Sequence, residues 1–69
     1  MLLHITISDE EDGWLVAECP ALPGCVSQGR DMQEAIGNIR EAMSAWLWAA
    51  DQKALLSIPP ECHTVLIDA

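Results

Sequence analysis

The stretch Glu18-Cys-Pro-Ala-Leu-Pro-Gly-Cys-Val-Ser-Gln-Gly29 decides the fold, because it ends one strand, turns the chain and leads into a helix. Pro20 and Pro23 have no backbone N–H to donate to a sheet, so the apolar strand Trp14–Cys19 must end before them. Pro23-Gly24 is a typical turn sequence. The residues after it, Cys25–Gln28, are therefore predicted to form a short third strand, antiparallel to the second.

The segment after Gly29 has the pattern of a helix that runs from Asp31 to about Gln52. Asp31 is a suitable N-cap, and Glu34 follows three residues later, as in a capping box. Apolar residues then recur at helical spacing and form one stripe: Ala35, Ile36, Ile39, Ala42, Met43, Trp46, Leu47 and Ala50. Trp48 falls about 200° around the helix from Trp46, among polar positions.

Strand patterns also flank this central part of the chain. Leu3–Ser8 alternates apolar and polar residues, as a half-buried strand does, and Asp9–Gly13 then supplies a hairpin turn. Cys62–Asp68 is rich in β-branched residues, so a right-handed crossover from the helix is predicted to lay it parallel to the first strand. The predicted fold is a single α+β domain over residues 1–69, in the order β-β-β-α-β, with one helix on one face of a four-stranded sheet.

Composition narrows the classes of partner. The chain has 69 residues, a net charge of −8 and only three basic residues, so it is poorly suited to bind DNA or RNA directly. Its charge suits a basic protein partner better. A domain this small buries little surface, so we also expect it to form a homo-oligomer, either a dimer or a tetramer. The sequence shows neither a signal peptide nor a membrane span, which makes the cytoplasm the expected compartment.

The residue types that carry chemistry do not form a recognisable site. The acids available to a metal-dependent nuclease are mostly in one run that is typical of a solvated turn: Asp9, Glu10, Glu11, Asp12, Glu18 and Asp68. Cys19, Cys25 and the Cys62-His63 pair lack the spacing of a structural zinc site and are interpreted as buried free cysteines. We therefore predict no catalytic residue, no metal site and no cofactor.

Several motifs resemble the HicB-like antitoxin family. They are Asp12-Gly13 followed by an aromatic residue, Pro20-x-x-Pro-Gly-Cys25, and Glu34-Ala35 with Asn38-Ile-Arg-Glu-Ala42, in this order over residues 5–50. The resemblance implies a partial RNase H-like fold. It also implies the antitoxin half of a toxin–antitoxin pair, whose partner is a small basic toxin that cleaves mRNA. Many family members carry a C-terminal DNA-binding segment, which we do not expect in this chain.

Two functions follow from this reading. The first is an antitoxin that neutralises its toxin by direct protein–protein contact. The alternative is a stand-alone homo-oligomeric domain with a structural or small-ligand role. In either case Trp48 is the predicted intermolecular anchor, because a large apolar ring on the polar face of a helix is not explained by the protein's own core. The other predicted interface residues are Trp14, Leu15, Pro23 and Gly24.

Overall fold

Three short antiparallel strands form the sheet of this protein. The computed structural model of the protein describes residues 1–68. Strands β1 (Thr6–Asp9), β2 (Leu15–Glu18) and β3 (Val26–Gly29) lie in the order β1-β2-β3, so β2 is central. Thr6 pairs with Glu18 across β1 and β2, and Leu15 pairs with Gly29 across β2 and β3. The three strands predicted near these positions are therefore confirmed.

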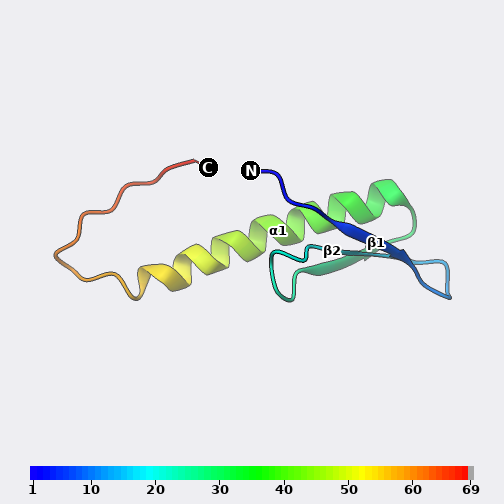
Figure 1. Ribbon diagram of the computed structural model, residues 1–69, viewed down its shortest axis with the longest axis horizontal. Helices are drawn as coiled ribbons and strands as arrows, with labels where there is room; N and C mark the ends of the chain where they lie inside the picture. The colour runs from blue at the N-terminus through cyan, green and yellow to red at the C-terminus, as the bar shows by residue number, and fades with distance from the viewer. Residues whose placement is uncertain (69) are drawn as a thin grey trace.

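One long helix, α1 (Met32–Leu55), follows β3 and covers one face of the sheet (Figure 1). Asp31 caps it as predicted, because its Oδ1 accepts a hydrogen bond of 2.8 Å from the Glu34 N–H. The first half of α1 lies on the sheet and its second half extends past it. The predicted α+β class, with one helix on one face, is confirmed, and the helix is a little longer than its sequence pattern indicates.

The core lies between β2, the corner after it and the first half of α1. Its buried members come from these segments: Ala17, Cys19, Leu22, Cys25, Ala35 and Ile39. Gly29 brings helix and sheet together, since a Cβ built there would lie 2.3 Å from the Ala35 nitrogen. The closeness of the helix to the end of β3 thus depends on the missing side chain at this position.

The fourth strand is absent from the described residues, so this part of the prediction is wrong for the isolated chain. Residues 63–68 have no regular secondary structure and are exposed. The chain reverses direction at a turn in which the Cys62 N–H donates a 3.1 Å hydrogen bond to the Pro59 carbonyl. After this turn the tail lies away from the sheet (Figure 1). The physical reason is that α1 extends beyond the sheet, so the tail starts where no strand edge is available to pair with it.

Candidate binding surfaces

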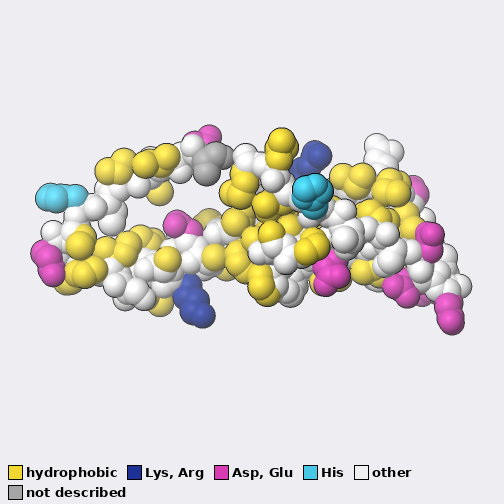
Figure 2. Space-filling view, in the orientation of Figure 1, with side chains coloured by type: hydrophobic (Ala, Val, Ile, Leu, Met, Phe, Trp, Pro, Cys, Tyr) yellow, Lys and Arg dark blue, Asp and Glu magenta, His cyan; other side chains and the backbone are white. Residues whose placement is uncertain are grey.

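One end of the molecule is acidic. The β1–β2 turn carries four consecutive exposed carboxylates in Asp9–Asp12, and acidic side chains gather at this end of the space-filling view (Figure 2). The turn is ordered by its own hydrogen bonds, among them one of 3.2 Å from the Trp14 N–H to Oδ1 of Asp12. This end therefore presents a fixed patch of negative charge.

An aromatic residue lies at the base of the acidic end. Trp14 is partly buried, and the Arg30 guanidinium lies 5.4 Å from the centroid of its ring, within range of a cation–π contact. Trp14 and Gln28 line a shallow depression of about 420 Å³ together with Glu10, Glu11 and Asp12. The surface thus combines carboxylates with one aromatic ring, a mixture suited to a basic protein surface.

The Pro-Gly corner lies at the opposite end of the sheet and is tied to the helix. Gly24 has a φ of +80°, in the region that favours glycine, and Leu22 is buried beneath the corner. The indole N–H of Trp46 donates a 2.9 Å hydrogen bond to the Pro23 carbonyl. Pro23 and Gly24 are exposed, but their first role is to turn the chain and anchor α1.

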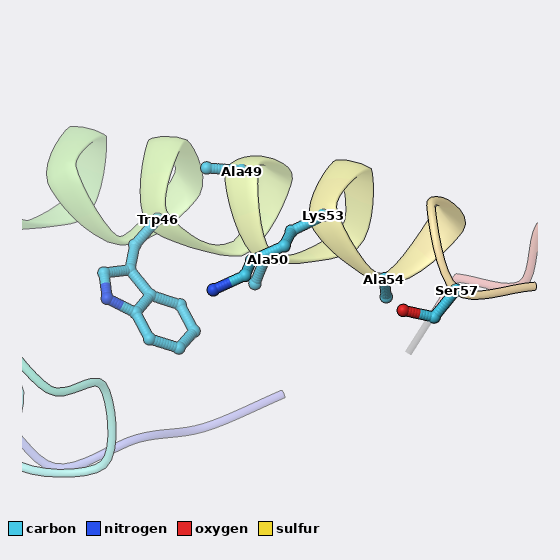
Figure 3. Close-up of a pocket in the computed structure, with 6 residues that line it drawn as sticks. All are labelled: Trp46, Ala49, Ala50, Lys53, Ala54 and Ser57. Carbon is cyan, nitrogen blue, oxygen red and sulfur yellow. The ribbon is translucent and has the colours of Figure 1, made fainter.

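The second half of α1 carries apolar surface with no cover from the sheet. A shallow groove of about 560 Å³ runs along it beyond the Trp46 ring (Figure 3). Ala50 and Ala54 line the groove with small side chains, and the Lys53 side chain extends back along the helix toward the indole. Trp48 lies outside this groove and is 67% exposed. The second half of α1, called the distal helix below, therefore exposes small apolar residues and the Trp48 ring.

The predicted interface residues do not form one site. Trp14 lies at the acidic end, Pro23 and Gly24 lie at the corner, and Trp48 lies on the distal helix. Leu15 is partly buried and packs against the core from β2, so it supports the sheet. The structure also adds residues that the sequence analysis missed. Among these, Arg30 lacked a signal because its contact with Trp14 depends on the pairing of β2 with β3.

The groups that could carry chemistry are dispersed or buried. Cys19 and Cys25 are buried and free as predicted, whereas Cys62 is exposed, which corrects that part of the prediction. Burial raises the pKa of the Cys25 thiol, and the neighbouring Cys19 raises it further, so Cys25 is a poor nucleophile at neutral pH. Within residues 1–68, no group of three or more His, Cys, Asp and Glu residues could hold a metal ion.

These surfaces lie on a small α+β domain, in which one helix covers one face of a three-stranded sheet. The chain belongs to the family described as "HicB_like antitoxin of bacterial toxin-antitoxin system", whose profile matches residues 2–65. The resemblance seen in the sequence is thus confirmed. No helix within residues 1–68 has both the length and the apolar character to cross a bilayer.

Curated relatives come from both bacteria and archaea. The chain is 46% identical to a UPF0150 protein of Thermoplasma acidophilum over 68% of each chain. It is 44% identical to a UPF0150 protein of Helicobacter pylori, over 83% of this chain and 81% of that one. A UPF0150 protein of Archaeoglobus fulgidus is 36% identical over 68% of each chain. The comparison with solved structures gave no significant match.

Proposed function

We propose that this chain is a non-catalytic antitoxin that neutralises a small basic mRNA-cleaving toxin by binding to it. Membership of the HicB-like antitoxin family carries the proposal. The net charge of −8 and the acidic β1–β2 turn support it, because opposite charges speed the encounter of two proteins. Since the toxin would act on mRNA, the proposal places both proteins in the cytoplasm.

The acidic end is the surface we propose for the toxin. Its four carboxylates would steer a basic protein toward it, and Trp14 would supply apolar contact area. Much of the steering should be lost at high salt, since exposed charges are screened over about 8 Å at physiological ionic strength. The proposal therefore predicts a complex whose rate of association falls steeply with added salt.

The first experiment is co-expression of the chain with the product of a short basic reading frame next to its gene. Growth arrest by that product alone, with growth restored by this chain, supports the proposal. A chain in which Asp9–Asp12 is changed to Asn-Gln-Gln-Asn keeps the size of each side chain and retains an oxygen to accept the Trp14 N–H. It should bind the toxin more slowly and rescue less well.

The matched control neutralises four exposed acids away from that end, through Glu41→Gln, Asp51→Asn, Glu61→Gln and Asp68→Asn. This variant changes the total charge by the same four units, yet it should rescue growth nearly as well as the unchanged chain. Equal rates of binding for both variants would rule out the acidic end as the toxin surface. A failure of the unchanged chain to bind any neighbouring basic protein would contradict the antitoxin function itself.

The second candidate function is a stand-alone homo-oligomer, and the apolar distal half of the molecule favours it. Trp48 is the proposed anchor on this half, because a tryptophan exposed by 67% gains most when a partner covers it. Trp48→Ala should lower the oligomeric mass while circular dichroism is unchanged if its contact is another copy. If its contact is the toxin, the oligomer should survive and neutralisation should weaken.

A further inference from the structure

The molecule is too extended for its mass. Its accessible surface is 5765 Å², whereas a compact monomer of 7.5 kDa exposes about 4,200 Å². Its radius of gyration is 15.5 Å, against about 11 Å for a compact chain of this length. The excess surface, roughly 1,500 Å², exceeds the ~800 Å² that each partner buries in a typical stable interface. The extended half therefore has the area that a dimer requires.

The tail contributes apolar surface that nothing in the described chain covers. Val65, Leu66 and Ile67 are 80%, 94% and 84% exposed. A gap separates this run of apolar side chains from α1 in the space-filling view (Figure 2). The gap is an opening of about 800 Å³, lined on one side by Asp51, Gln52 and Leu55 of the helix and on the other by residues 63–66. The tail is thus a strand-forming sequence without a sheet.

The sheet has the complementary feature, an edge without a strand. β1 pairs with β2 on one side, and within residues 1–68 no strand pairs with its other side. The opposite edge of the sheet is β3, and one of its backbone groups has a partner. The Asn38 side-chain amide donates a 2.8 Å hydrogen bond to the Gln28 carbonyl there. An exposed edge with free backbone groups is a template for another strand.

The chain's own tail is poorly placed to fill that edge. Trp46 lies over the Pro-Gly corner at one end of the sheet, where it bonds to the Pro23 carbonyl. Helix α1 continues for nine residues, or about 13 Å, beyond Trp46. The apolar segment Cys62–Ile67 spans about 20 Å when extended. If this segment runs back along the helix, its end lies only about 7 Å past Trp46, which is the length of two extended residues. A second copy has no such restriction.

The distribution of charge also favours pairing of the tail of one copy with β1 of another. Two copies that each carry a net charge of −8 repel one another over most of their surfaces. Residues 1–8, which lead into and form most of β1, contain no Asp or Glu, and neither does the segment Cys62–Ile67. Pairing these two segments places no carboxylates opposite each other. They are therefore where two copies can meet with little repulsion.

We propose that two copies exchange their tails, with residues 64–67 of each adding a strand to the outer edge of β1 of the other. The arrangement is symmetric, because each copy gives one strand and receives one. It restores the four-stranded sheet that the sequence pattern predicts, with the last strand supplied in trans. Its failure would leave the proposed toxin binding untouched, since the test uses the isolated chain.

The test compares proline at two adjacent positions, Val65→Pro and Leu66→Pro. Backbone N–H groups of neighbouring strand residues point to opposite sides, and an added edge strand has a partner on one side only. One variant should therefore lose a hydrogen bond and dissociate, and the other should stay dimeric. Sedimentation equilibrium at micromolar concentration should give twice 7.5 kDa for the unchanged chain. Glu61→Pro, which lies outside the proposed strand, should stay dimeric.

Each other outcome contradicts the proposal. A monomeric unchanged chain excludes exchange, and so does a dimer that neither proline weakens. Equal dissociation by both prolines would indicate side-chain docking without strand pairing. Circular dichroism checks that the fold is retained, and we expect no change, because residues 63–68 are exposed and outside the core.

Discussion

Gly29 offers the most direct test of how the helix meets the sheet. A Cβ at this position would lie 2.3 Å from the nitrogen and 2.7 Å from the Cα of Ala35. Both are backbone atoms, so no side chain can rotate away to make room. The same Ala35 N–H donates the 3.0 Å hydrogen bond to the Asp31 carbonyl at the start of α1, and Ala35 is fully buried. Gly29→Ala must therefore displace the first turn of the helix.

Overpacking of a core typically costs about 1–3 kcal/mol, and the shortness of these contacts places Gly29→Ala at the upper end, near ~3 kcal/mol. A chain of this length has a total stability of only about 3–10 kcal/mol, so the loss is large. The matched control is Gly37→Ala, where an added Cβ meets nothing within 4 Å. That change should stabilise the helix by about 1 kcal/mol, because alanine favours helix more than glycine does.

Urea denaturation followed by tryptophan fluorescence measures both variants at one fixed protein concentration, because self-association would otherwise alter the apparent stability. The expected result is opposite signs, with the Gly29 variant less stable and the Gly37 variant more stable than the unchanged chain. A Gly29→Ala protein of unchanged stability would refute the close approach of α1 to β3. A parallel loss in both variants would mean that α1 has a different rotation about its axis.

Three further outcomes follow from the same structure. Trp46→Ala should lower the free energy of unfolding by about 3 kcal/mol in chemical denaturation, because the ring packs on the core and bonds to Pro23. Trp48→Ala should change the same free energy by less than ~0.5 kcal/mol in dilute monomer. Asp31→Ala should cost about 1 kcal/mol through loss of the helix cap, whereas Asp31→Asn should retain most of it. The raised pKa of the Cys25 thiol keeps it protonated in the folded state at a pH where the unfolded chain already loses that proton. The free energy of unfolding should therefore fall as the pH rises above the ordinary cysteine pKa. Cys25→Ala should remove this contribution when denaturation is measured at a series of pH values.

Local signals explain why most of the fold could be predicted from the sequence. Pro20 and Pro23 end a strand because they lack an N–H, and Asp31 starts a helix because its carboxylate accepts from Glu34. Both effects act within a few residues, so they are visible in the sequence itself. The antiparallel order of the three strands follows from the short connections between them.

Contacts between distant residues could not be predicted in the same way. The hydrogen bond from Trp46 to Pro23 joins residues 23 positions apart, and its existence depends on where α1 crosses the corner. The alternation in Cys62–Asp68 indicates a strand, but it carries no information on which edge receives that strand. The candidate surfaces were likewise only partly predictable, because Trp48 has a clear phase on the helix whereas the contact of Arg30 with Trp14 depends on strand register.

The acidic β1–β2 turn and the tail lie at opposite ends of a molecule 53 Å long (Figure 1). The edge that would receive the partner's tail is β1, however, and β1 ends at Asp9, the first residue of the acidic turn. If a toxin on the turn and a partner's tail beside β1 fit together, the complex contains two antitoxins and two toxins. If the two surfaces compete, adding toxin should dissociate the dimer. By thermodynamic linkage, toxin binding weakens dimerisation by the same factor as dimerisation weakens toxin binding. A measured mass for the complex that equals two of each chain would show that the surfaces are separate, whereas a complex of one toxin with one antitoxin would show that they overlap.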